Sequence, residues 1–160
     1  MDILAIYGLI AGLASTAGMT LAEIPSWKKW GLHGVFEWHE NQVITKRLFG
    51  IPGGEKETIH IKGIFFFHFL NGTLVGVVFP LIIAYLFPSF INDIIALLLL
   101  GIVYGLIVWI VTLVPIHKPI TRLSPWNHPL GKWPAIASLL GHIVYGFILG
   151  LTIFALFNIF

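Results

Sequence analysis

The sequence predicts an all-α, polytopic membrane protein: a bundle of four transmembrane helices with an interfacial segment on its cytoplasmic side. Three observations predict this fold. The 160-residue chain is 58% hydrophobic and only 10% charged, whereas a soluble domain carries about 25% charged residues. Four apolar runs each reach roughly the 20 residues that a helix needs to cross the hydrocarbon of a bilayer. All nine Lys and Arg residues lie in two of the segments that connect these runs.

The four predicted helices cover about residues 3–24, 63–87, 94–116 and 135–158 of a single transmembrane domain, 1–160. Backbone groups find no partners in lipid, so a helix is the structure that satisfies such runs. The alternation expected of a membrane β-barrel is not seen. Asp2 precedes the first run and no Lys or Arg does, which favours a retained helix over a cleaved signal peptide.

The basic residues predict the orientation of the bundle. They all lie in the connections 25–62 and 117–134. By the positive-inside rule these connections are cytoplasmic, and both termini then lie outside the cell membrane. The basic residues are too few and scattered for nucleic acid. They suit the headgroups of anionic lipids, with His117, Lys118 and Arg122 expected near the membrane surface.

Each predicted helix contains a pair of glycines four residues apart. Four residues advance a helix by about 400°, so each pair lies on one face. The pairs are Gly8 and Gly12, Gly72 and Gly76, Gly101 and Gly105, and Gly146 and Gly150. Such faces let helix backbones approach closely in lipid, and we expect them to pack the bundle. Pro80 interrupts the second helix and predicts a kink that acts as a hinge, with an ordinary membrane proline as the alternative.

The second and fourth predicted helices share a histidine that stands one turn before the glycine pair. The motifs are His68-x3-Gly72-x3-Gly76 and His142-x2-Tyr145-Gly146-x3-Gly150. This pattern resembles that of small four-helix prokaryotic membrane proteins of unknown function. The resemblance covers mainly the helices. It implies a four-helix fold and carries no activity with it.

His68 and His142 are expected to face the bundle interior at similar depth, because each continues its glycine face. In an up-and-down ring their helices are diagonal, and neighbours 8–10 Å apart give a diagonal of roughly 11–14 Å. That span accommodates haem b between two imidazoles. The alternatives are hydrogen bonds between helices or, with Asn71, part of a proton path.

A second group of candidate ligands lies in the first connection. If residues 33–41 are helical, His33, Glu37 and Glu40 fall within about 60° on one face. Glu23, at the end of the first helix, is positioned to add a fourth ligand. Imidazole and carboxylate donors suit a divalent metal such as iron, manganese or zinc. The alternative is a solvated, salt-bridged interfacial segment.

Three classes of function follow from these observations. We expect first a non-catalytic accessory or assembly subunit of a larger membrane complex, redox complexes included, because the chain is small and has no recognisable catalytic set. Its partners are then other membrane subunits or a second copy of the chain. The second class is a haem- or metal-binding membrane redox protein. The third is a small transporter or proton channel, suggested by Pro80 and the intramembrane histidines.

Overall fold

The computed structural model describes residues 3–50 and 59–159, and within them the chain is helical, with no strands. Four helices are long and apolar enough to cross a membrane. They are α1 (Ile3–Trp30), α3 (Ile61–Leu86), α6 (Trp133–Ile159) and α4 (Ile94–Thr112), which continues through a π-helical turn, η3 (Leu113–His117), into α5 (Lys118–Thr121). The shorter elements are α2 (Phe36–Leu48) and the 3-10 turns η1 (Leu32–Gly34) and η2 (Pro88–Phe90). The all-α expectation is confirmed for the described residues.

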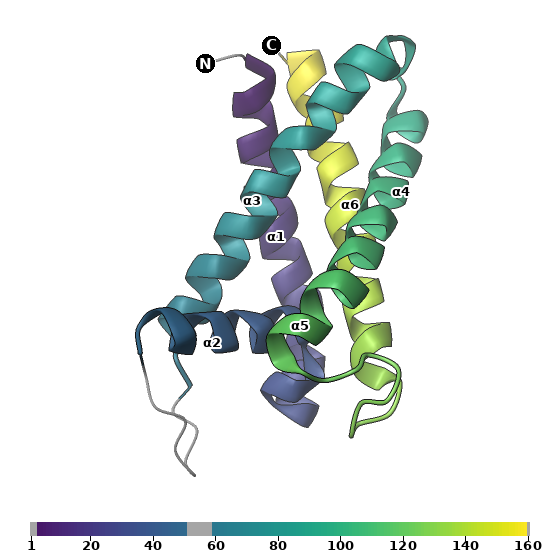
Figure 1. The fold of residues 1–160 in the computed structure, drawn as a ribbon. Helices are drawn as coiled ribbons and strands as arrows, with labels where there is room; N and C mark the ends of the chain where they lie inside the picture. Colours follow the sequence, from purple (N-terminus) through teal and green to yellow (C-terminus); the bar gives the residue numbers. More distant parts are fainter. Residues whose placement is uncertain (1–2, 51–58, 160) are drawn as a thin grey trace.

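The four long helices form an up-and-down bundle in which α3 packs on α1, α1 on α6, and α6 on α4. As expected, α3 and α6 stand diagonally to each other. Both chain ends lie at one end of the bundle, and α2 crosses the opposite end almost at right angles to the bundle (Figure 1). We call this opposite end the basic end, because the connections around α2 and α5 carry the Lys and Arg residues.

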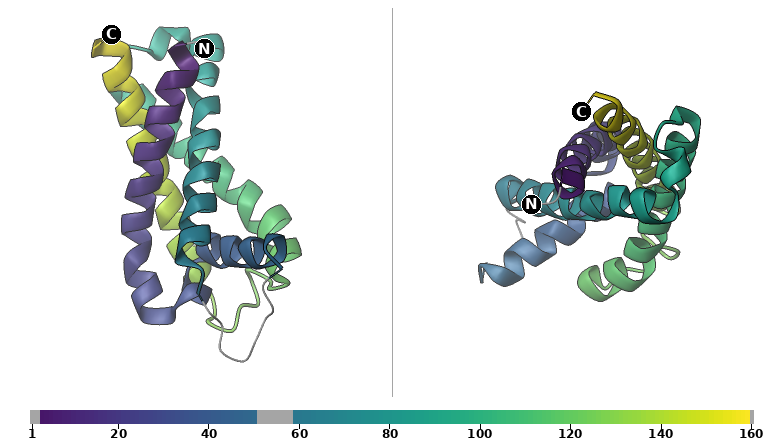
Figure 2. Two further views of the ribbon diagram at one scale, coloured as in Figure 1. Left: turned by 90° about the vertical axis from the view of Figure 1, so that its left-hand side faces the viewer. Right: turned by 90° about the horizontal axis from the view of Figure 1, so that it is seen from above.

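The helices α3 and α4 are joined through η2 but diverge from there toward the basic end (Figures 1 and 2). Two tyrosines tie α3 to α4 and to α6. Tyr104 of α4 donates a hydrogen bond to the carbonyl of Val75 at 2.7 Å, and Tyr145 of α6 donates one to the carbonyl of Gly72 at 2.7 Å. Between Tyr104 and the basic end, α3 and α4 are separated by a cavity.

The glycine pairs pack the bundle, as predicted. Those of α1 and α3 face each other, and a methyl carbon on Gly12 would lie 2.8 Å from the carbonyl oxygen of Thr73. Those of α4 and α6 also face each other, and a methyl carbon on Gly146 would overlap the carbonyl oxygen of Gly101. The close approach of both helix pairs therefore depends on glycine.

The helix ends differ from the predicted boundaries in two places. The first helix runs through Pro25 to Trp30 instead of ending near residue 24. Its last turns are held by ring packing of Trp27 on Trp38 at 5.7 Å and of Trp30 on Trp133 at 6.3 Å. The third helix leaves α-helical geometry after Thr112, three residues before Pro115, whose missing N–H disrupts the regular bonding pattern.

Candidate functional site

A cavity of about 350 Å³ lies in the basic half of the bundle, between α3 and α4. Helix α2 borders it at the basic end, and α1 and α6 form its back wall. Its polar lining residues are Thr16, Glu37, Glu40, Asn41, His68, Asn71, Thr112, His142 and Tyr145. Its apolar lining residues include Met19, Leu74, Val75, Val108 and Ile116. The cavity lining thus combines carboxyl and imidazole groups with hydroxyl, amide and apolar side chains.

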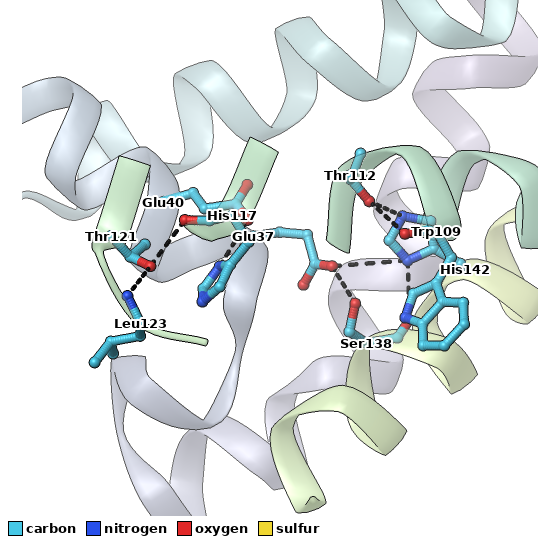
Figure 3. A network of polar contacts seen from close by, with 9 residues as sticks. All are labelled: Glu37, Glu40, Trp109, Thr112, His117, Thr121, Leu123, Ser138 and His142. Atoms are coloured by element: carbon cyan, nitrogen blue, oxygen red, sulfur yellow. Dashed lines mark hydrogen bonds and ion pairs between the residues drawn. The ribbon is translucent and has the colours of Figure 1, made fainter. Parts of the chain in front are cut away.

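Glu40 and His117 form the tightest of three carboxylate–imidazole pairs. Oε1 of Glu40 lies 2.8 Å from Nδ1 of His117, which is fully buried (Figure 3). The ring of Phe36 packs on the imidazole with 4.1 Å between centroids. Burial, with the nearby charge of Glu37, raises the pKa of Glu40 to about 9. The Glu40 carboxyl group therefore carries a proton at neutral pH.

Glu37 and His142 form the second pair, and Ser138 joins them. The Ser138 hydroxyl donates a hydrogen bond to Oε1 of Glu37, and Nδ1 of His142 lies 3.7 Å from the same oxygen (Figure 3). Nδ1 of His142 is also 2.9 Å from the Ser138 carbonyl, to which it donates. Burial alone would raise the pKa of Glu37, but His142 and the Ser138 hydrogen bond outweigh it and lower that pKa. Two neighbouring carboxyl groups on α2 therefore favour opposite protonation states.

Glu23 and His68 form the third pair, between α1 and α3. Glu23 is only 1% exposed, and its Oε2 lies 3.8 Å from Nε2 of His68. The same ring nitrogen is 3.1 Å from the hydroxyl oxygen of Thr20. Glu37 lies close enough to Glu23 for the two carboxyl groups to interact electrostatically. The third pair is thereby coupled to the second.

A group of four histidines lies at the basic end beside the cavity. His33 packs on His39 with 4.5 Å between ring centroids and lies 6.5 Å from His128. His39 is in turn 6.3 Å from His117. Burial and the neighbouring imidazoles of His33 and His117 lower the pKa of His128.

The predicted metal ligands are only partly brought together. A shared face for His33, Glu37 and Glu40 required a helix across residues 33–41. Helix α2 begins at Phe36 and His33 lies in the separate turn η1, so His33 does not share a face with the two glutamates. The three carboxylates of Glu23, Glu37 and Glu40 do converge. Among the described residues, no three His, Asp or Glu side chains are arranged to hold a metal ion. Metal binding stays a prediction.

The two predicted haem ligands, His68 and His142, line the same cavity. Each is engaged by neighbouring side chains. Nε2 of His142 lies 3.5 Å from the hydroxyl of Thr112, and Nε2 of His68 is bonded to Thr20. The haem hypothesis also stays a prediction, and the observed contacts are the interhelical hydrogen bonds that were its alternative.

Two residues of the site were not identified from the sequence. His117 was expected near the membrane surface but is fully buried against Glu40. Ser138, which bonds Glu37, is one of many small polar residues in apolar helices and has no distinguishing signal. All seven histidines lie in or near the two basic connections of the predicted bundle, and this concentration was the available indication of such a site.

No family model matches this chain, and neither a curated protein nor a solved structure matches it.

Proposed function

We propose that the chain is an integral membrane protein of the small transporter class that translocates protons, with the basic end cytoplasmic and both termini outside. The observation that carries the proposal is the set of three carboxylate–imidazole pairs around one cavity. Ionisable groups within a membrane are costly, and they commonly mark proton or ion pathways. The orientation rests on the basic connections beside α2 and α5.

The pairs have the chemistry that proton transfer requires. Each joins a carboxyl group to an imidazole. Only Glu40 and His117 lie within hydrogen-bond distance, at 2.8 Å, whereas the members of the other two pairs are 3.7 and 3.8 Å apart. At Glu40 the proton moves from the carboxyl oxygen to Nδ1 of His117, which leaves a carboxylate and an imidazolium. The titratable groups around Glu37 and Glu40 are Glu23 of α1, His68 of α3, His117 of η3 and His142 of α6.

The polar lining reaches only part of the way through the bundle. Beyond Thr16 and Tyr145 the interior is closed by an apolar core that includes Ala11, Phe79 and Leu149. Translocation therefore requires this core to open. Pro80 lies in α3 next to Phe79 and removes the helical hydrogen bond to the Gly76 carbonyl. A hinge at Pro80, as the sequence predicts, would move the helix at the level of this apolar core.

The glycine faces also bear on the choice of function. Glycine faces can also serve contacts with another membrane subunit. Here all eight glycines pack within the bundle, between α1 and α3 or between α4 and α6. The accessory-subunit and redox hypotheses stay predictions, and neither has a contact in the described residues that favours it over proton translocation.

Proton flux into liposomes tests the proposal. The purified chain is reconstituted into liposomes that enclose a pH-sensitive dye. An imposed potassium diffusion potential then drives protons inward. We expect wild-type flux well above that of empty liposomes, and at least a tenfold reduction in Glu37→Gln and in Glu40→Gln. Asp93→Asn is the matched control, because Asp93 is exposed, begins α4 at the opposite end of the bundle and lines no part of the cavity.

Two results would overturn the proposal. One is a proton flux into liposomes with correctly folded wild-type protein, as judged by circular dichroism, that equals the flux into empty liposomes. The other is an equal loss of flux in Asp93→Asn and in the two cavity variants, since this would assign the effect to general destabilisation.

A further inference from the structure

The cavity has an opening on the side of the bundle. Its lining includes Leu74 of α3 and Ile116 of η3, which are 55% and 38% exposed on the outer surface. Tyr104 closes the space above this opening by bonding across to Val75. The opening therefore lies at the level of the apolar helix surfaces and faces the bilayer in a membrane-inserted protein.

The lining of the cavity differs between its elements. It is apolar where Val75 of α3 and Val108 of α4 face it, and acidic where Glu37 and Glu40 face it from α2, which we call the inner end. A volume of about 350 Å³ falls within the roughly 300–1,000 Å³ of small-molecule pockets. The shape and polarity fit an amphipathic molecule whose apolar body lies between α3 and α4 and whose polar group reaches α2.

The charge of the inner end selects the polar group. The described lining residues include two carboxyl groups and two imidazoles but no Lys or Arg. The second carboxylate oxygen of Glu37, Oε2, is fully buried and accepts no hydrogen bond from an N–H group or from a Ser, Thr or Tyr hydroxyl of the described residues. The carboxyl group of Glu23 lies within interaction distance of Glu37, so acidic groups gather at this end of the cavity. A positive charge placed beside them is favourable, whereas an anionic group would add to the repulsion.

We propose that the cavity binds a hydrophobic organic cation, which enters sideways from the bilayer between α3 and α4 and places its positive charge beside Glu37. This inference rests on the proposed proton function, because the cation and the proton then compete for the same carboxyl groups. A positive charge near Glu40 favours loss of the Glu40 proton to water. One positive charge enters the cavity and one proton leaves it, so the net charge of the site is conserved.

The titratable groups around Glu37 and Glu40 come from each element that borders the acidic end of the cavity. They are Glu23 of α1, His68 of α3, His117 of η3 and His142 of α6. Because the bound cation takes the place of the Glu40 proton, cation binding strengthens as pH rises. We expect at least a tenfold tighter dissociation constant at pH 8 than at pH 6.

Tetraphenylphosphonium is a suitable probe, because its charge is permanent and its surface is apolar. Its binding to the purified full chain in detergent is measured by equilibrium dialysis. Tetraphenylborate, which has the same shape and the opposite charge, corrects for partition into micelles. We expect saturable 1:1 binding of the cation, no saturable binding of the borate, and at least tenfold weaker cation binding by Glu37→Gln.

Two neighbouring residues of α4 test the route of entry. Val108 lines the cavity, whereas Ile107 is 53% exposed and does not line it. Val108→Trp is expected to weaken tetraphenylphosphonium binding at least tenfold, and Ile107→Trp is expected to leave it unchanged. Equal effects of the two substitutions would contradict entry between α3 and α4.

The outcomes separate this inference from the proposed function. Proton flux without saturable cation binding, or with equal binding of the cation and the borate, would overturn the inference and leave proton translocation standing. Cation binding that is unaffected by pH and by Glu37→Gln would also overturn it. Saturable, pH-dependent cation binding without proton flux would support the inference and contradict proton translocation.

Discussion

Oε1 of Glu40 lies 2.8 Å from Nδ1 of His117, although the two residues are 77 positions apart in the sequence. Helix α2 supplies the carboxyl group, and the π-helical turn η3 supplies the imidazole. Because α2 crosses the end of the bundle, it brings acidic side chains under helices that are otherwise apolar (Figure 1). The site is therefore made by the crossing of α2 and not by any single transmembrane helix.

The raised pKa of Glu40 predicts how stability depends on pH. The folded protein keeps a proton on Glu40 up to about pH 9, whereas the unfolded chain releases it near its ordinary value of 4.5. The contribution of this group to stability is therefore largest at low pH, and it falls by about 1.4 kcal/mol per pH unit between the two values. Thermal unfolding in detergent at pH 5 to 8 should show a shallower decline for Glu40→Gln than for wild type. An identical slope in both proteins would contradict a protonated Glu40.

Gly146 predicts a strong effect of a single methyl group on stability. A methyl carbon there would overlap the backbone carbonyl of Gly101, so α4 and α6 must separate. We expect Gly146→Ala to destabilise the protein by about 1–3 kcal/mol, as overpacking does in other cores. In the control Gly18→Ala, the added methyl overlaps the flexible tip of the Ile148 side chain and makes an ordinary contact with Val144, but it meets no backbone atom. Melting temperatures measured in one detergent compare the two, and an equal shift would contradict the glycine-dependent packing of α4 on α6.

Asp93 predicts a capping effect at the start of α4. Its Oδ1 accepts hydrogen bonds from the backbone N–H groups of Ile95 and Ala96, at 2.9 and 3.0 Å. Asp93→Ala removes both and is expected to cost about 1 kcal/mol, whereas Asp93→Asn keeps an acceptor and costs less. Chemical unfolding followed by circular dichroism measures the difference. A larger cost for Asn than for Ala would refute this role.

Pro80 predicts an effect on proton flux that is separate from stability. Replacing it by alanine restores the hydrogen bond to the Gly76 carbonyl and stiffens α3 beside the apolar core. We expect Pro80→Ala to slow proton flux several-fold while its melting temperature stays equal to or above that of wild type. Flux at the wild-type rate in a stable Pro80→Ala protein would leave Pro80 as an ordinary membrane proline.

The long helices and their glycine contacts could be predicted from the sequence because both depend on local pattern. Runs of apolar residues determine the helices, and a four-residue spacing determines which glycines share a face, as Gly146 and Gly150 do. Pro25 was less informative. Proline opposes a helix locally, but aromatic packing of Trp27 and Trp30 extends α1 beyond it.

The site could be predicted only in part, because its contacts are long-range. Glu37, Glu40, His68 and His142 were identified as candidates, and all four line the cavity. Their pairing was not predicted, since it depends on where α2 crosses the bundle. His117 reaches Glu40 from the π-helical turn, which has no recognised sequence signal apart from Pro115.

Infrared spectroscopy of the Glu40 carboxyl group shows whether the cavity holds an exchangeable proton. Difference spectra of wild type and Glu40→Gln, recorded in detergent over a pH series, isolate the band of the protonated carboxyl group. We expect a Glu40-dependent band that is present at pH 7 and is lost in a titration centred near pH 9. The absence of that band at pH 7, or a band that does not titrate, would contradict an exchangeable proton on Glu40.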